Sequence, residues 1–172
     1  STSGGPVLHA SQWGSEGKGK IAAYLASEYR AMIRSGGPNA GHTFYDNRTK
    51  YVNRQIPCGV FSSCFLYIAP AGDVNISILK EEIKRYNLTP KQLMIDKRAM
   101  VITNKHIKRE QSSSLKSRLA STCEGVGAAQ SDKIWRIGKL FGEEVKHTPL
   151  EKYGGDTVAA IHKRIINGEL LL

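Results

Sequence analysis

The sequence predicts an α/β fold in which a mostly parallel, open sheet carries helices on both faces and a P-loop-like glycine loop follows the first strand. Short apolar runs alternate with segments whose apolar residues recur every three or four positions, and Gly or Pro marks the boundaries between them. With 172 residues, 40% of them apolar, the chain can bury a core, and we expect residues 1–172 to form a single α/β domain.

The first predicted unit is a strand, a loop and a helix. Residues 7–10 form a short apolar run, and the glycine-rich loop spans residues 14–20. The helix that follows is indicated by apolar residues at helical spacing, namely Ile21, Ala22, Leu25 and Ala26. This order places a helix N-terminus directly after glycines, which is the arrangement that points backbone N–H groups at phosphate.

The later elements alternate in the same way. The predicted strands and helices are residues 32–33, 65–69 and 93–95, and residues 76–86 and 157–166, respectively. Residues 169–172 are predicted to begin a further buried strand. Asp73 is predicted to cap the helix that starts near Ile76, with a contact to a nucleotide hydroxyl as the alternative.

The net charge of +10 indicates anionic partners, either nucleic acid or free nucleotides. Part of the excess lies in one serine-rich stretch that contains Lys105, His106, Lys108, Arg109, Lys116 and Arg118. This stretch has no aromatic residues for base stacking, so a solvated basic face is favoured over a nucleic-acid site.

Cellular context is indicated by what the sequence lacks. No apolar run approaches the roughly 20 residues needed to cross a bilayer, and residues 1–6 do not resemble a signal peptide. We therefore expect a cytoplasmic protein without membrane contact. Cys58, Cys64 and Cys123 show neither a disulfide framework nor a zinc pattern, and are predicted to be small buried thiols.

Two glycine-lined turns are the candidate site. In the first, the glycines allow close approach to phosphate and Lys18 and Lys20 supply positive charge, although Ile21 stands where a P-loop needs Ser or Thr for magnesium. In the second, residues 36–43 place Asn39 and His42 in a tight turn that exposes its side chains, which suits proton or phosphate chemistry.

Four motifs in order resemble the adenylosuccinate synthetase family. They are residues 12–20, 39–43, 56–59 and 121–129, the last followed by Asp132, Lys133 and Arg136. The resemblance covers nearly the whole chain but about the first half of a family member. It therefore implies that this domain is the N-terminal half of a longer synthetase.

The resemblance implies a carbon–nitrogen ligase that uses a nucleoside triphosphate (ATP, dATP or GTP), Mg²⁺, a purine monophosphate and L-aspartate. The purine 6-oxygen accepts the γ-phosphoryl group, and the aspartate amine then displaces phosphate. The implied catalytic residues are Ser15, Lys18 and His42. The implied triphosphate site comprises Gly14, Glu16, Gly17, Lys18, Gly19, Lys20, Gly41, His42 and Thr43.

The resemblance also implies a monophosphate site, a metal site and a homodimer. The implied monophosphate contacts are Ser15, Asn39, Ser121, Thr122 and Arg136. Arg136 reaches the substrate from the other subunit. The metal position falls on Ser15 and on the carbonyl of Gly41. Positioning and electrostatic stabilisation are most of what phosphoryl transfer requires, which fits these residue types.

Ser15 departs from the family pattern, which has aspartate as the base and magnesium ligand. A serine hydroxyl is a poor base and a poor ligand for a hard cation. A viral branch, the 2-amino-2'-deoxyadenylosuccinate synthetases, has a small residue here and acts on deoxyguanylate for diaminopurine DNA. A smaller side chain leaves room for the 2-amino group of guanine. The sequence is most like this branch, and in that case its location would be the host cytoplasm.

Three other interpretations stay open. One is the ordinary enzyme, which acts on inosinate with GTP. Another is a basic nucleotide- or nucleic-acid-binding protein without catalysis, and the last is an inactive fragment. Cys123 and Glu124 stand where the family has glycine and arginine, so phosphate contacts there are expected from elsewhere, for example from Lys116 or Arg118.

Overall fold

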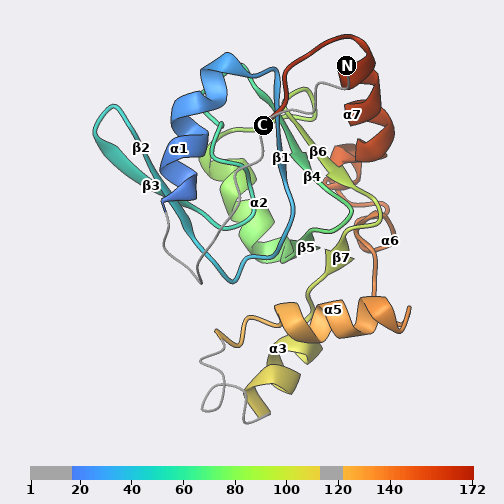
Figure 1. The fold of residues 1–172 in the computed structure, drawn as a ribbon. Coiled ribbons are helices and arrows are strands. Elements are labelled where there is room, and N and C mark those ends of the chain that lie inside the picture. Colours follow the sequence, from blue (N-terminus) through green and yellow to red (C-terminus); the bar gives the residue numbers. More distant parts are fainter. Residues whose placement is uncertain (1–16, 113–121) are drawn as a thin grey trace.

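The computed structural model describes residues 17–112 and 122–172 (Figure 1). The predicted first strand at residues 7–10 lies outside the described residues. So do Gly14, Ser15, Glu16 and Ser121 of the predicted site, and Lys116 and Arg118 of the basic stretch.

A four-stranded parallel sheet forms the centre of the molecule. Its strands are β1 (Ala31–Arg34), β4 (Phe65–Ile68), β6 (Leu93–Asp96) and β8 (Gly154–Gly155), in the order β1-β4-β6-β8. Every neighbouring pair is parallel. The mostly parallel sheet and the three strands predicted within it are confirmed.

Helices and smaller strands surround this sheet. The helices are α1 (Lys18–Leu25), α2 (Ile76–Arg85), α3 (Asn104–Ser112), α5 (Val126–Ile134), α6 (Phe141–Glu144) and α7 (Thr157–Ile166), with 3₁₀ turns at Ala26–Glu28 and Glu151–Tyr153. The smaller strands are β2 (His42–Asp46), β3 (Thr49–Asn53), β5 (Asp73–Val74) and β7 (Met100–Val101). The predicted helix at residues 157–166 has the predicted bounds.

Both faces of the sheet are covered, as predicted, because side chains alternate along each strand. The residues on one face join Leu79 of α2 in the main core, and they are Met32, Leu66, Ile68, Leu93 and Ile95. The residues on the other face pack with Ala160 and Ile161 of α7, and they are Ala31, Ile33, Phe65, Tyr67 and Met94. Figure 1 shows α2 and α7 on opposite sides of the sheet.

One detail of the predicted helices is wrong. Asp73 does not cap α2, because it lies in β5, and the side chain of Asn75 accepts the N–H groups of Ser77 and Ile78 instead. The helix indicated by the spacing of Ile21, Ala22 and Leu25 is present as α1, although Ile21 is 47% exposed. The face of α1 that packs inward carries Gly19, Ala22 and Ala23.

The hairpin of β2 and β3 was not predicted. Its strands pair in antiparallel fashion, with His42 opposite Asn53 and Asp46 opposite Thr49. Asn47 and Arg48 form the connection, with φ of 45° and 66°, which is the conformation that two-residue hairpin turns require. The hairpin lies beside α1 (Figure 1).

The end of the described chain runs alongside β1. Leu172 donates its N–H to Ala31, and the carbonyls of Leu170 and Leu172 accept from Arg30 and Ile33. Leu171 is 7% exposed and forms a parallel bridge to Ala31. The predicted start of a buried strand at residues 169–172 is confirmed in part, because Leu171 is buried in a single β-bridge whereas Leu170 is 56% exposed.

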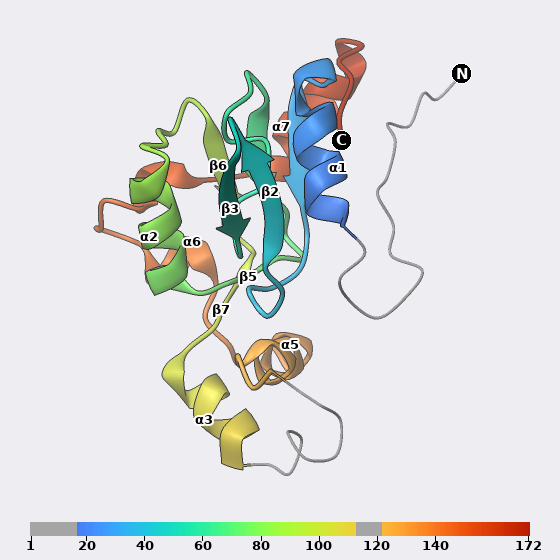
Figure 2. The same cartoon turned by 90° about the vertical axis from the view of Figure 1, so that its left-hand side faces the viewer.

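Helices α3 and α5 form a small lobe below the sheet (Figures 1 and 2). The predicted solvated basic face holds for Lys105, Lys108 and Arg109, which are exposed, but is wrong for His106. His106 is 4% exposed and contacts Asp132 at 2.9 Å, and the exposed Arg109 forms an ion pair with the same carboxylate at 2.8 Å. These contacts tie α3 to α5.

The three cysteines are free and buried, as predicted. Burial raises the pKa of the Cys58 and Cys64 thiols to about 11. Within residues 17–112 and 122–172, no helix is long and apolar enough to cross a membrane.

We predict that Asp96→Asn lowers the free energy of unfolding at pH 7 by about 2 kcal/mol. The buried Asp96 carboxylate accepts hydrogen bonds from Arg98 and from the N–H and hydroxyl of Thr157 at the start of α7. Burial alone raises the pKa of Asp96, but these hydrogen bonds outweigh it and lower the pKa to about 2.

Because the folded pKa lies below the unfolded value of about 3.9, this stability is present above pH 4 and is lost as pH falls toward 2. Denaturant unfolding from pH 7 to 2 measures this change, and the variant should show a shallower fall below pH 4. Asp46→Asn, at the end of the exposed hairpin, is the control. Equal stability of Asp96→Asn and the native chain at pH 7 would contradict the prediction.

Candidate functional site

The described part of the first glycine loop forms the start of α1. Gly17 precedes the helix with φ of 76°, and its carbonyl accepts the N–H groups of Lys20 and Ile21. Gly19 faces the hairpin so closely that an added Cβ would lie 3.0 Å from the Thr43 carbonyl oxygen and 3.1 Å from the Cβ of His42. Glycine at position 19 therefore lets the first turn of α1 pack against His42 and Thr43.

The second predicted turn connects β1 to β2. Asn39, Ala40 and Gly41 are exposed, and His42 is half-buried as the first residue of β2. The predicted exposure of this turn is confirmed for Asn39. Because Gly19 contacts His42 and Thr43, the start of α1, which includes Lys18, lies beside the start of β2.

Arg34 supports this turn from below. It is the last residue of β1 and is 9% exposed. Its Nη2 donates to the carbonyls of Gly37, Ala40 and Arg54 at 3.4, 3.5 and 2.6 Å. Within the described residues, its buried Nη1 atom has no hydrogen-bond partner.

His42 has an unusual protonation equilibrium. Burial, followed by the positive charges of Arg34 and Lys18, lowers the pKa of His42 to about 4. The imidazole is therefore neutral at pH 7 and can act as a hydrogen-bond donor at one ring nitrogen and an acceptor at the other.

The turn before α5 is held by Glu110. Its carboxylate accepts the N–H groups of Gly125 at 2.7 Å and Ala128 at 3.0 Å. Gly125 has φ of 81°, and a Cβ there would lie 2.9 Å from Ile102 and 3.0 Å from the Ile107 nitrogen. Thr122, predicted to bind the monophosphate, is exposed at the beginning of this turn.

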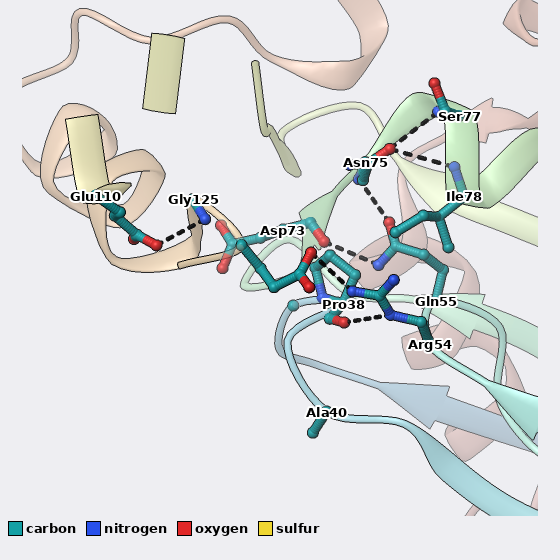
Figure 3. Close-up of polar contacts among 12 residues, drawn as sticks. Pro38, Ala40, Arg54, Gln55, Asp73, Asn75, Ser77, Ile78, Glu110 and Gly125 are labelled. Carbon is teal, nitrogen blue, oxygen red and sulfur yellow. Dashed lines mark hydrogen bonds and ion pairs between the residues drawn. The ribbon is translucent and has the colours of Figure 1, made fainter. Parts of the chain in front are cut away.

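The structure brings together two turns, the β1–β2 turn (residues 35–41) and the turn before α5 (residues 122–125). A Cβ on Gly37 would lie 2.6 Å from a methyl group of Val126, so the β1–β2 turn touches the start of α5. Arg54, just after β3, donates from Nε to the Pro38 carbonyl at 2.8 Å and forms an ion pair with Glu124 at 2.8 Å (Figure 3). One side chain thus contacts both turns, although residues 38 and 124 are far apart in the sequence.

Asp73 provides a second link between the turns. Its N–H donates to the Gly36 carbonyl at 3.1 Å, and its buried carboxylate accepts the amide of Gln130 on α5 at 2.6 Å. Burial raises the pKa of Asp73, and the Gln130 hydrogen bond opposes that effect. Asp73 thus positions α5 against the β1–β2 turn.

Arg136 and Thr122 lie beyond opposite ends of α5. Arg136 follows α5 with φ of 57° and is exposed. Thr122 precedes the opposite end of α5, which is roughly 13 Å long at 1.5 Å per residue. Beside Arg136, the side chains of Ile134, Trp135 and Ile137 are 79%, 73% and 71% exposed.

Four supporting residues were missed by the sequence analysis. Three are Arg34, Arg54 and Glu110, and the fourth is Glu82, whose carboxylate accepts the backbone N–H groups of Arg54, Gln55 and Ile56. Only Arg34 carried a local signal, as a charged residue that ends an apolar strand directly before a glycine turn. The other three act on segments far along the chain, and no sequence pattern marks them.

The part of the chain that the structure describes shows no metal cluster at these turns. Residues 17–112 and 122–172 contain no group of three His, Cys, Asp or Glu side chains that could hold a metal ion. A hollow of about 200 Å³ lies between α1, the hairpin and residues 58–62, but none of the predicted site residues lines it. The candidate site is therefore a meeting of exposed turns.

The fold and the site define an α/β protein with glycine-rich turns that suit phosphate binding. Comparison with known proteins gives the family. The sequence model of the family described as adenylosuccinate synthetase matches residues 7–167. The chain therefore belongs to the adenylosuccinate synthetase family. Members of this family are ligases that form carbon–nitrogen bonds.

Relatives and solved structures agree with this assignment. Adenylosuccinate synthetase of Leuconostoc mesenteroides is 39% identical over 83% of this chain and 37% of its own length, and that of Thermococcus onnurineus is 33% identical over 96% and 50%. The fully ligated Plasmodium falciparum enzyme has a TM-score of 0.83 and 23% identity, covering 94% of this chain and 48% of that one.

A further solved structure is the cyanophage S-2L succinoaminodeoxyadenylate synthetase (PurZ), bound to dGMP and to dATP as an energy donor. It has a TM-score of 0.78 and 30% identity, covering 93% of this chain and 47% of that one. The chain thus spans about half the length, or less, of the relatives that it matches.

We predict that His42 titrates near pH 4 in the nucleotide-free protein, well below the ordinary histidine value of about 6.5. Since the folded pKa is lowered, the neutral ring contributes stability that is lost as pH falls from about 6.5 to 4. NMR titration of the imidazole measures this directly. Lys18→Gln removes one of the two positive charges and should raise the pKa of His42. Titration of His42 near 6.5 in the native chain would contradict the prediction.

Proposed function

We propose that this chain belongs to a ligase that joins L-aspartate to C6 of deoxyguanylate through a 6-phosphoryl intermediate. A nucleoside triphosphate is hydrolysed in the reaction. The product is 2-amino-2'-deoxyadenylosuccinate, a precursor of diaminopurine DNA. Ser15 is the observation that carries the choice of substrate, because a small hydroxyl stands where the family pattern has a carboxylate.

The substrate choice follows from the size and charge of position 15. Guanine carries a 2-amino group that inosine lacks, and serine leaves space for it and can accept a hydrogen bond from it. The 30% identity with the cyanophage synthetase, which was solved with dGMP and dATP, supports the same choice. We further propose a viral origin on this basis, with the host cytoplasm as the location.

The described residues support a phosphoryl-transfer site. The helix N-terminus at Gly17 to Lys20 suits a phosphate, and Lys18 adds positive charge. His42 is positioned beside Gly19 and is neutral, so it would donate a hydrogen bond to the transferring phosphoryl group. Asn39 and Thr122 would hold the monophosphate from the two exposed turns, together with Ser15 and Ser121.

These residues fit a magnesium ion that would bind both the protein and the phosphates of the triphosphate. Mg²⁺ keeps several waters and takes one or two protein oxygens, and the exposed turn offers the Gly41 carbonyl for this purpose. The ion would neutralise charge on the β- and γ-phosphates. Ser15 would contribute at most a weak oxygen ligand.

None of the residues assigned above is proposed to bind L-aspartate or the base of the triphosphate. The chain spans 37% to 50% of the length of relatives in its family. We propose that residues 1–172 form the N-terminal domain of such a synthetase. The two missing subsites are expected in the part of the enzyme that this chain does not include.

The second candidate function is the ordinary reaction on inosinate with GTP. It is favoured by the identities of 33% to 39% with bacterial and archaeal adenylosuccinate synthetases. Both candidates share the 6-phosphoryl step and differ at the purine 2-position, so a substitution at position 15 separates them.

We predict that Ser15→Asp lowers turnover of deoxyguanylate at least tenfold and raises turnover of inosinate, because the carboxylate fills the space for the 2-amino group and restores a base; about 1–3 kcal/mol is typical of such steric discrimination. The measurement is kcat/KM for both monophosphates in the full-length enzyme. Ser27→Asp, an exposed position beyond α1, adds the same charge elsewhere as the control. Undiminished deoxyguanylate turnover with no gain on inosinate would count against the proposal.

We also propose a homodimer in which Arg136 reaches the partner's monophosphate site. Exposed Ile134, Trp135 and Ile137 surround Arg136 and form an apolar patch that suits a second copy. In a two-fold dimer, each site would combine the turns of one subunit with Arg136 of the other.

Subunit mixing tests this arrangement. Arg136→Ala and His42→Ala should each lower activity at least tenfold, because each removes a group in contact with phosphate. Mixed dimers contain one intact site, so random mixing should restore roughly a quarter of native activity. Trp135→Glu should prevent recovery and yield monomers in sedimentation. Mixed dimers that form without recovering activity would show that Arg136 acts within its own subunit.

A further inference from the structure

The segment after β3 is fixed in place between the two substrate turns. The backbone N–H groups of Arg54, Gln55 and Ile56 all donate to the carboxylate of Glu82, which is 2% exposed. The side-chain amide of Gln55 spans the gap to the Asp73 carbonyl at 3.0 Å and accepts the N–H of Asn75 at 2.6 Å (Figure 3). This network holds the backbone from which the Arg54 side chain projects.

The guanidinium of Arg54 is held at two atoms. Nε donates to the Pro38 carbonyl, and Nη2 contacts the Glu124 carboxylate, both at 2.8 Å. The side chains of Arg54 and Glu124 are 34% and 35% exposed. Among the described residues no acceptor contacts Nη1 of Arg54, so part of the donor set of this partly exposed guanidinium remains for another group.

The negative charge of Glu124, in the turn before α5, suggests a role for Arg54 beside it. Glu124 is an anion in a turn that the proposed function assigns to a nucleotide phosphate, and on its own it would repel that group. Pairing with Arg54 neutralises the carboxylate. The same contact holds the guanidinium in the orientation from which its remaining donors can bind phosphate oxygens in a fork.

We propose that Arg54 binds the 5'-phosphate of the monophosphate substrate, with Pro38 and Glu124 holding the guanidinium in position. This assignment rests on the proposed function and adds to it a cation that the motifs did not indicate. A merely structural ion pair at this exposure would contribute little to stability. Arg54 instead serves as a substrate-binding residue at the junction of residues 38–42 and 122–125.

Calorimetric titration of the full-length enzyme with deoxyguanylate, and with deoxyguanosine as the probe that lacks phosphate, tests the assignment. Arg54→Ala should weaken deoxyguanylate binding about tenfold to a hundredfold, as expected for loss of a charge-assisted hydrogen bond, and leave deoxyguanosine binding unchanged. Arg54→Lys should recover part of the loss, because it keeps the charge without the fork. In steady-state assays, KM for deoxyguanylate should rise while kcat stays within about twofold.

Arg85→Ala is the matched control, because Arg85 is an exposed arginine on α2 that contacts the Val52 carbonyl and its removal changes the net charge equally. Glu124→Gln should bind deoxyguanylate within about threefold of the native enzyme, since a neutral partner keeps a hydrogen bond to Arg54. A loss in Glu124→Gln as large as in Arg54→Ala would overturn the assignment in favour of a structural latch. Equal weakening of deoxyguanylate and deoxyguanosine would also overturn it.

The native enzyme is measured first, with deoxyguanylate and inosinate. Binding of neither would overturn the proposed function and, with it, the role of Arg54. Binding of a monophosphate by the native enzyme with no change in Arg54→Ala would overturn the role of Arg54 alone.

Discussion

The buried carboxylate of Glu82 is the contact on which the arrangement of the site depends. It accepts three successive backbone N–H groups, those of Arg54, Gln55 and Ile56. These hydrogen bonds compensate for burying a negative charge, and without them Glu82 would be strongly unfavourable at 2% exposure. Because Glu82 belongs to α2, and α2 packs on the sheet through Leu79, the segment that carries Arg54 is tied to the central sheet.

From this contact the constraints pass to both turns. Arg54 reaches Pro38 in one turn and Glu124 in the other, and Gln55 bridges Asp73 to the cap of α2. Asp73 in turn holds the carbonyl of Gly36 and the side chain of Gln130. Glycine at position 37 permits the close approach of Val126. These contacts fix the two turns relative to each other, and under the proposed function such a preformed arrangement would reduce the ordering that substrate binding must impose.

The sequence predicted the parts of this structure that depend on local pattern. The strands at 31–34, 65–68 and 93–96 contain apolar runs, as buried parallel strands do. The helical spacing of Val158, Ile161 and Ile165 located α7, although only Ile161 of the three packs against the core. The hairpin was missed because β3 is polar and mostly exposed, and its turn lacks the glycine that marks such hairpins. The asparagine cap of α2 was missed because a nearby aspartate offered the same chemistry.

The site shows the same division between local and non-local information. Glycines and the histidine of the two turns could be located from the sequence, since each motif is contiguous. Arg54, Glu82 and Glu110 could not, because Glu82 lies 28 positions from Arg54 and Glu110 lies 15 positions from Gly125. Such pairs become visible only when the sheet and the α3–α5 lobe place their segments side by side.

The positive charges around the β1–β2 turn explain why an anion would suit it as a ligand. Arg34 is buried with one guanidinium nitrogen unpartnered among the described residues, and burial lowers its pKa, with the charge of Glu82 opposing that effect. Burial, with the positive charges of Arg34 and Lys18 adding to it, lowers the pKa of His42, so both charged neighbours of the ring that affect this pKa are cations. A phosphate bound there would offset the cost of burying Arg34. The same phosphate would raise the pKa of His42, because an opposite charge favours the imidazolium. In the proposed function, binding of the anion would therefore strengthen His42 as a hydrogen-bond donor to the transferring phosphoryl group.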